Sequence, residues 1–512
     1  MKDKVMKPQA GSFVNLDEYY HFQKIDTSSP QGQRMYQDFL IFLLNMSVYR
    51  LFGVERQLMV HYSIGDGVFC KFINDAVDSE LSDEVIARLK SEMFHIISEQ
   101  IFIEKIPVPV EKAYDILEAF GRPDVIKNLD FHNKKYLQLY KADDYFDYYP
   151  RALPFNTDCD IRFDIVKVND GFVLRFTPEK EFVLPKLLFS QFQEHDHWCK
   201  ILDVQTVGDI NRLINKHSVR DFILTEEALH EKKIAHLADS IFMRKTVKFV
   251  LIAGPSSSGK TTFAQRLAVQ LSVNGFHCKV IGMDDYFLPR DRTPRPPNGE
   301  HDFESIKALD VPLLNDHLNC LLRGESVRLP RFNFFSGERE ESNHILKLGD
   351  NDILIIEGIH GLNEELTASI PCENKVKIYI SALNQLNIDY HNRIPTTDCR
   401  KIRRIVRDAQ YRGYSAEQTL QRWHSIRAGE DTNIFPFQEQ ADFMFNSSLT
   451  YELGVMRKHV MPLLRSIHYK SSVYNDAHDL IALFEHFMDI KDELVPHNSI
   501  LREFMSGSVF EY

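Results

Sequence analysis

Cysteines, signal-like segments and long apolar runs are all scarce in this sequence. The seven cysteines are scattered and form neither a C-x-x-C pair nor another metal-ligand spacing, so we expect reduced thiols rather than a disulfide framework. The N-terminus lacks the apolar segment of a secretory signal. The longest apolar stretch, residues 39–52, contains polar side chains and is too short to span a bilayer. We therefore expect a cytoplasmic protein without a membrane segment.

An excess of positive charge is also lacking. The formal net charge of −12 argues against a protein that binds nucleic acid over a generally basic surface, although it leaves room for a local basic patch. The chain has 512 residues, which exceeds the length of chain that usually folds around a single hydrophobic core, so we expect two or more domains. Its composition, 44% hydrophobic and 26% charged, is typical of a folded soluble protein.

One strong motif stands near the middle of the chain. Residues 254–261 match G-x-x-x-x-G-K-[ST], and they lie between an apolar, strand-like run and a helical pattern. Such a loop binds phosphates through converging backbone N–H groups and the positive end of the following helix. Lys260 is expected at the β- and γ-phosphates, and the Thr261 hydroxyl at Mg²⁺. The predicted nucleotide-binding residues are Gly254, Pro255, Ser256, Ser257, Ser258, Gly259, Lys260, Thr261 and Thr262.

Two predicted strands after this loop end in carboxylates. Strand 278–283 leads into Asp284 and Asp285, and strand 353–358 contains Glu357. Ligands lie beyond the carboxyl ends of strands in parallel α/β sheets, so these side chains should meet the phosphate loop. Asp284 could then accept a proton from a substrate hydroxyl, and Glu357 could hold Mg²⁺ or its water shell. The alternative is that these carboxylates only cap turns.

A third element is a predicted helix with an arginine face. Arg400, Arg403, Arg404 and Arg407 stand at i, i+3, i+4 and i+7, whereas apolar residues cover another face. The local charge is +5 over residues 400–412, from six basic residues and one acid. This pattern suits a lid that closes over transferring phosphates. A solvated face and an RNA contact surface remain alternatives.

These motifs occur in the order found in the uridine kinase and phosphoribulokinase family, which residues 246–470 resemble. Further matching phrases are HDFES at 301–305, LPRFNF at 329–334, PTTD at 395–398 and YRGY at 411–414. The resemblance implies a P-loop kinase fold, with a parallel sheet flanked by helices, that phosphorylates a hydroxyl using MgATP. It identifies Asp284 as the catalytic base and Arg403, Arg404 and Arg407 as lid arginines.

The same resemblance predicts the acceptor and its site. The acceptor is expected to be a nucleoside, uridine above all, phosphorylated at its 5'-hydroxyl. Asp302 would bind the ribose hydroxyls, and the other predicted substrate residues are Phe287, Phe332 and Arg400. Short uridine-cytidine kinases supply a tyrosine and a histidine to the pyrimidine, where this sequence has Phe332 and Gly337, so the base contacts are not predicted. A kinase of another sugar or phosphosugar alcohol and an ATP-dependent RNA-binding or regulatory protein remain alternatives.

The front of the chain predicts a separate α+β domain. A helix at 34–52, a hairpin around Gly65-Asp66-Gly67 and a helix capped by Ser82 are expected. The order of these elements resembles that of the second N-terminal domain of threonyl-tRNA synthetases. With such a front domain fused to a kinase domain, the whole chain resembles the long bacterial uridine kinase-like proteins. That domain's H-x-x-x-H pair is replaced here by Asp38 and Phe42, so no editing or metal residues are expected. RNA binding through this domain and self-association remain open.

The remaining segments complete the predicted organisation. Thr206 and Thr225 are expected to begin connector helices. His195 and His197 alternate and would not share a helical face, which favours a surface or interface role over a metal site. The predicted parts are a flexible lead-in at 1–24, the α+β domain at 25–185, a helical connector at 186–245, the kinase domain at 246–470, and a C-terminal helix (476–493) with an irregular tail at 471–512.

Overall fold

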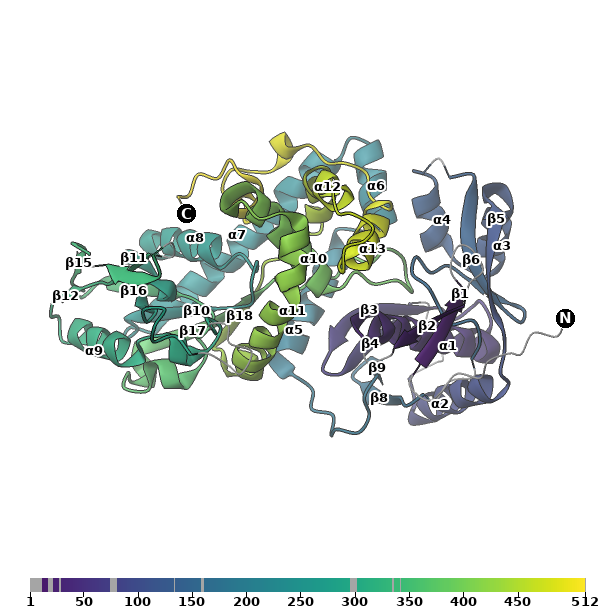
Figure 1. Cartoon of the computed structure of the whole chain (residues 1–512), viewed down its shortest axis with the longest axis horizontal. Helices are drawn as coiled ribbons and strands as arrows, with labels where there is room; N and C mark the ends of the chain where they lie inside the picture. Colours follow the sequence, from purple (N-terminus) through teal and green to yellow (C-terminus); the bar gives the residue numbers. More distant parts are fainter. Residues whose placement is uncertain are drawn as a thin grey trace.

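The computed structural model describes residues 12–16, 22–26, 29–73, 81–132, 134–157, 161–294, 302–333, 336–340 and 342–511. A larger α/β region and a smaller front α+β region lie at opposite ends of the molecule, with connecting and C-terminal helices between them (Figure 1). Six of the seven cysteines belong to the described residues and are free thiols. Among the described helices, none combines the length and apolar character needed to cross a membrane.

The α/β region is built on a five-stranded parallel sheet in the order β11-β16-β10-β17-β18. Its strands are β10 (Phe249–Ala253), β11 (His277–Gly282), β16 (Asp352–Glu357), β17 (Lys375–Ser381) and β18 (Phe443–Asn446). All residues of β10 and the four aliphatic residues at 353–356 of β16 are buried, which explains their continuous apolar runs. Because β10 is central, the loop that follows it lies in the middle of the carboxyl edge.

Helices cover both faces of this sheet. Val250 and Ile252 pack into one hydrophobic cluster with α8, α10 and α12, whereas Phe249 and Leu251 pack into another with α9. The predicted parallel sheet flanked by helices is therefore confirmed. The helices are α8 (Lys260–Val273), α9 (Val311–Leu322), α10 (Thr396–Arg407), α11 (Ala416–Asn433) and α12 (Glu452–Arg465). Two small antiparallel pairs, β12 (Val327–Arg328) with β15 (Ile345–Leu346) and β13 (Arg331–Asn333) with β14 (Glu338–Glu340), lie after α9.

The connector is helical as predicted, but one helix begins earlier. Its helices are α5 (Lys186–Ile201), α6 (Val207–Asn215) and α7 (Val219–Met243). Thr206 forms the predicted capping box with Asp209. Thr225, expected to begin the next helix, lies inside α7 and donates its hydroxyl to Asp221 O at 2.8 Å. A threonine can bond the carbonyl four residues back within a helix, so its presence does not by itself mark a start.

The front region contains two antiparallel sheets, β3-β4-β9-β8 and β5-β6-β7. The predicted first helix, the Gly-Asp-Gly hairpin and the Ser82 cap are all present. Its elements are α1 (Pro30–Phe52), β3 (Leu58–Ile64), β4 (Gly67–Phe72), α2 (Asp83–Ser98), β5 (Ile103–Pro109), α3 (Val110–Ala119), α4 (Pro123–Leu129), β6 (Tyr136–Ala142), β7 (Tyr145–Asp147), β8 (Asp164–Val168) and β9 (Gly171–Arg175).

The predicted lead-in contains regular structure that the sequence pattern did not indicate. Two strands, β1 (Ser12–Leu16) and β2 (Phe22–Asp26), pair in antiparallel register. The first lies inside the predicted lead-in, and the second extends past its end. Strand pairing depends on a partner elsewhere in the chain, so it can occur without a clear local period. Residues 1–11 and 17–21 lie outside the described part of the chain.

The C-terminal part of the chain differs most from its prediction. The helix expected over 476–493 is α13 (Tyr474–Phe484), which ends where Phe484 and Phe487 enter the main core. The following chain returns to the α/β region, where Glu503 contacts Thr262 at the start of α8 (Figure 1). It contains the short helix α14 (Arg502–Met505).

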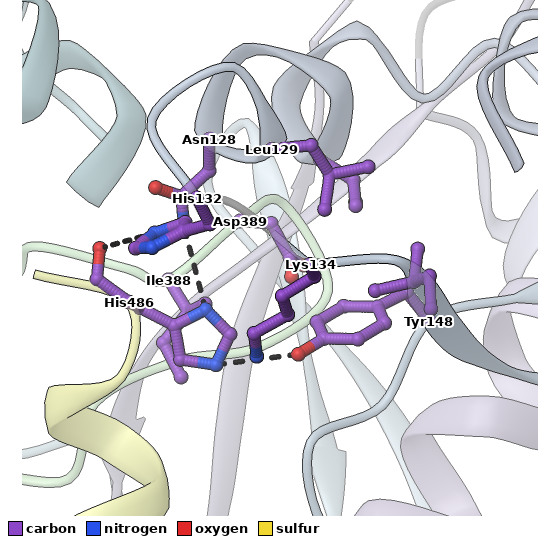
Figure 2. A pocket seen from close by; sticks show the side chains of 10 residues that line it. Asn128, Leu129, His132, Lys134, Tyr148, Ile388, Asp389 and His486 are labelled. Atoms are coloured by element: carbon purple, nitrogen blue, oxygen red, sulfur yellow. Dashed lines mark hydrogen bonds between the residues drawn. The ribbon is translucent and has the colours of Figure 1, made fainter. Parts of the chain in front are cut away.

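A polar junction joins this C-terminal part to the front region. The buried His486 ring lies 3.3 Å from Asn128 Nδ2 through Nδ1 and 3.2 Å from the Tyr148 hydroxyl through Nε2, around a small cavity (Figure 2). Burial lowers the pKa of His486 to about 3, so the ring is neutral. Nearby, Arg122 forms ion pairs with Asp124, Asp147 and Asp389, the last of which belongs to the α/β region. These buried contacts hold the regions in one arrangement.

Candidate active site

The phosphate loop depends on two glycines. A Cβ on Gly254 would lie 1.9 Å from the Ile380 carbonyl oxygen, so the loop can approach β17 this closely only without a side chain. Gly259 has φ +86°, in the left-handed region that glycine adopts readily, and it turns the chain into α8. The first turn of α8 therefore presents its free N–H groups at the carboxyl edge of the sheet.

Lys260 is folded back over this loop. Its Nζ donates to the carbonyl oxygens of Gly254 at 3.0 Å and Pro255 at 3.3 Å. Burial lowers the pKa of Lys260, while the nearby Glu357 carboxylate raises it. The ammonium group thus lies beside the carboxylates, as expected where the carboxyl ends of parallel strands meet the phosphate loop.

The carboxylate of β16 meets the loop directly. Thr261 Oγ1 donates to Glu357 Oε1 at 3.0 Å, because β16 and β10 are neighbours in the sheet. A hydroxyl and a carboxylate suit Mg²⁺, which prefers oxygen ligands and retains waters. Within the described residues no group of three or more His, Cys, Asp or Glu side chains could hold a metal by itself. Bound Mg²⁺ would therefore depend on phosphate oxygens and water as well as on these two residues.

Asp284 follows β11 in a short 3-10 helix, Met283–Tyr286. Its side chain is accessible, yet the surrounding protein raises its pKa by desolvation, an effect that Lys260 opposes. Asp285 faces another way, because its Oδ1 accepts the Phe332 N–H at 3.3 Å. The two adjacent carboxylates are thus distinguished by their contacts, and Asp284 is the one that interacts with Lys260.

Two of the four predicted phosphate-facing arginines lie behind the loop. Arg400 is 1% exposed, donates to Ser256 O at 2.9 Å and pairs with Glu430. Arg403 is 0% exposed, donates to Ser447 O at 2.9 Å and pairs with Glu452. Both guanidinium groups pair with carboxylates and support the loop, and their contacts with the acceptor and with transferring phosphate stay predictions. Helical spacing shows which residues share a face, but not whether that face is buried.

Arg404 and Arg407 lie closer to the nucleotide side. Arg404 donates to the Ser256 hydroxyl, and Arg407 NH1 lies 3.9 Å from Glu503 Oε1. Burial, with nearby Arg412, lowers the pKa of Arg407 to about 10. These two arginines remain the predicted phosphate ligands of the helix. A π-helical turn at Asp408–Arg412 follows α10, a feature often found at functional sites.

The predicted acceptor residues Phe287 and Phe332 pack together in a hydrophobic cluster with residues of α9. Phe287 and Phe332 are buried, with ring centroids 5.6 Å apart. Asp302 Oδ1 accepts the Glu304 N–H at 3.1 Å. Gly337 has φ +73°, and a Cβ there would lie 2.3 Å from Arg290, so the turn itself requires glycine. His301 and Phe334, from the matching sequence phrases, lie outside the described residues.

Three further carboxylates lie at this site, and none was predicted as a functional residue from the sequence. Glu430, on α11, accepts the Ser256 N–H at 2.9 Å, and Glu503, near the C-terminus, accepts the Thr262 N–H at 3.2 Å. Burial, followed by Glu430, raises the pKa of Glu304 to about 7, whereas Arg404 and Lys260 lower it. Glu304 belongs to the matching HDFES phrase, but Glu430 and Glu503 lie more than 160 residues from the loop and carry no local signal.

The side chains of His195 and His197 lie on different faces of α5, as their spacing predicts. His195 is buried on α5, whereas His197 is exposed and lines a surface cavity with His61 and Asp196. The two rings do not share a face, and this cavity lies against the front region rather than at the phosphate loop.

Comparisons with known proteins agree with this geometry. Residues 249–453 match the model of the phosphoribulokinase / uridine kinase family. A uridine kinase from Deinococcus deserti is 30% identical over 193 residues, which are 37% of this chain and 83% of the relative. Uridine-cytidine kinase B from Dictyostelium discoideum is 26% identical over 192 residues, 37% of this chain and 71% of the relative.

A solved structure described as a possible uridine kinase from Bacillus stearothermophilus is 21% identical, with a TM-score of 0.29, over 42% of this chain and 98% of its own. The family match begins at residue 249, so the resemblance of the front region to a threonyl-tRNA synthetase domain remains a prediction. Through its α/β region, the chain belongs to the phosphoribulokinase/uridine kinase family.

Proposed function

We propose that this protein transfers the γ-phosphate of ATP to the 5'-hydroxyl of a nucleoside such as uridine. The observation that carries the proposal is the meeting of Lys260, the Thr261–Glu357 pair and Asp284 at one edge of the sheet. A protein that only binds ATP needs no proton acceptor beside the phosphate loop, whereas a kinase of alcohols does. The resemblance of this chain to uridine kinases of the family supports a nucleoside as the acceptor.

Each residue has a distinct proposed role. The loop amides and Lys260 bind the nucleotide phosphates, and Thr261 and Glu357 would hold Mg²⁺. The metal, when bound, neutralises charge on the phosphates. Asp284 accepts the proton of the acceptor hydroxyl, and its raised pKa makes it a stronger base than an ordinary aspartate. Arg404 and Arg407 contact the transferring phosphate, while Arg400 and Arg403 hold the loop in place.

A second candidate is a kinase of another sugar or phosphosugar alcohol. The residues Phe332 and Gly337 favour it, because neither side chain offers a hydrogen bond to a base edge. A panel of nucleosides, sugars and RNA, assayed for ATP-dependent phosphorylation or ATP turnover, tests these possibilities together. Phosphorylation of nucleosides supports the first proposal, of sugars alone the second, and turnover with RNA alone contradicts both.

The acceptor site predicts a specific order of preference. Removing the 2'-hydroxyl should lower kcat/KM more than exchanging the base, because Asp302 offers a charged acceptor to the sugar. Losing a hydrogen bond to a charged group costs about 1.5 to 3 kcal/mol, or roughly 10- to 150-fold, against about 2- to 10-fold for a bond to a neutral group. The comparison is kcat/KM for uridine, deoxyuridine, cytidine and a purine nucleoside with the same MgATP. Strict preference for uracil together with tolerance of deoxyribose would contradict it.

A further inference from the structure

The C-terminal segment packs directly against the phosphate loop. Ile500, Leu501 and Phe504 are fully buried in the hydrophobic core that also contains residues of α8 and α10. A Cβ on Gly259 would lie 2.6 Å from Ile500 Cγ2, which shows how closely this segment approaches the start of α8. The segment arrives there after passing over the α/β region (Figure 1). It is therefore anchored beside the nucleotide-binding loop.

One side chain of this segment accepts hydrogen bonds from the start of α8, directly after the loop. Glu503 Oε2 accepts the Thr262 N–H at 3.2 Å and the Thr262 hydroxyl at 2.8 Å. Thr262 is 0% exposed and Glu503 is 8% exposed, so water has little access to this contact. The N–H belongs to the first turn of α8, where the backbone donors point out of the end of the helix. The carboxylate thus binds where the helix end favours an anion.

A nucleotide phosphate needs the same position. In a loop of this motif, the backbone N–H groups at the start of the helix hold the α- and β-phosphates. A carboxylate and a phosphate cannot both accept from the same N–H, and two anions at such a short separation repel each other strongly. MgATP can therefore occupy the loop fully only after the Glu503 carboxylate has left Thr262.

We propose that Glu503 is an internal competitor of the nucleotide, a carboxylate that takes the place of a phosphate at Thr262 and lowers the affinity for ATP. This inference rests on the proposed function of the loop. The side chain rather than the whole segment moves, since withdrawal of the segment would expose Ile500 and Phe504. A rotation of the Glu503 side chain is sufficient, because its backbone lies outside the loop.

The contact with Arg407 couples this movement to the lid helix. Arg407 NH1 lies 3.9 Å from Glu503 Oε1, so the carboxylate attracts one of the two arginines that remain available for phosphate. When a phosphate replaces the carboxylate at Thr262, the same guanidinium group gains a stronger anion nearby. Displacement of Glu503 thus makes Arg407 available when nucleotide arrives.

The test compares three proteins, the wild type, Glu503→Gln and Glu493→Gln. Glutamine can still accept from Thr262 but carries no charge, and Glu493 is an exposed acid on the same segment. Isothermal titration calorimetry with MgATP should give a Kd about tenfold lower for Glu503→Gln, since tenfold corresponds to about 1.4 kcal/mol. Glu493→Gln should match the wild type. Adenosine, which has no phosphate, should bind all three proteins equally.

Each outcome decides between the alternatives. An unchanged or higher MgATP Kd in Glu503→Gln overturns the inference, because the carboxylate then does not compete with phosphate. An equal gain for adenosine also overturns it, since the effect would not concern the phosphate position. If neither the wild type nor Glu503→Gln binds MgATP, the proposed function fails as well. If the wild type binds MgATP and Glu503→Gln binds it with the same Kd, the inference fails while the proposed function stands.

Discussion

Replacement of Asp284 by asparagine is expected to lower kcat by about 100-fold or more, with little change in the Kd for MgATP. Asparagine retains the size of the side chain but cannot accept the proton of the acceptor hydroxyl. Asp284 interacts with Lys260 at the carboxyl edge, where the γ-phosphate is expected. Steady-state kinetics together with MgATP titration measures both effects. Turnover close to that of the wild type would remove Asp284 from its proposed role.

The adjacent carboxylate provides a matched control. Asp285 accepts the Phe332 N–H instead of interacting with Lys260, so Asp285→Asn should reduce kcat much less. Lys260→Ala should behave differently from both, losing MgATP binding itself. Because the base must be deprotonated and desolvation by the surrounding protein raises its pKa, wild-type kcat should fall as the pH decreases through that raised pKa. This acid limb should be absent from the residual activity of Asp284→Asn.

The largest expected effect on stability comes from Arg122→Met. Arg122 is 3% exposed and pairs with Asp124, Asp147 and Asp389, which are equally buried. Removing one partner of a buried ion pair leaves uncompensated charge and costs about 3 to 5 kcal/mol. Denaturant unfolding of the full chain measures this loss. Arg162→Met is the control, because Arg162 is 71% exposed in its pair with Glu179 and such surface pairs contribute about 0 to 1 kcal/mol.

The same variant should show a defined pH dependence. Burial raises the pKa of Asp389 to about 6, although Arg122 opposes this effect. Without Arg122 the pKa should rise further, so the folded state binds a proton that the unfolded state releases. A carboxyl with a raised folded pKa stabilises the fold at low pH and destabilises it as pH increases. The deficit of Arg122→Met should therefore be smaller at pH 5 than at pH 8, and a pH-independent deficit would contradict this explanation.

Local pattern was sufficient for the elements that surround the phosphate loop. The apolar run before the phosphate loop predicted β10, the helical pattern after it predicted α8, and the strand predicted at 353–358 corresponds to β16. The convergence of Thr261 and Glu357 also followed, since carboxyl ends of parallel strands meet at one edge. Such predictions succeed where neighbouring residues alone decide the conformation.

Other elements depended on contacts that no local pattern contains. The last long helix ends at Phe484 because the following side chains are buried elsewhere, and α7 begins before Thr225 because tertiary packing extends it. The strands β1 and β2 need each other. In each case the competing conformation is similar in local propensity, and distant contacts determine the outcome.

The amino-acid sequence by itself determined the phosphate loop, the strands that lead into it and into Asp284 and Glu357, and the family to which the α/β region belongs. Only the tertiary structure decided which charged groups reach the loop. It buries Arg400 and Arg403 behind the loop and leaves Arg404 and Arg407 nearer the nucleotide side. It also brings Glu503 to Thr262 across a separation of 241 residues in the chain. The physical reason is that a motif fixes short-range backbone geometry, whereas the partner of a buried charge is set by the packing of residues far apart in the chain.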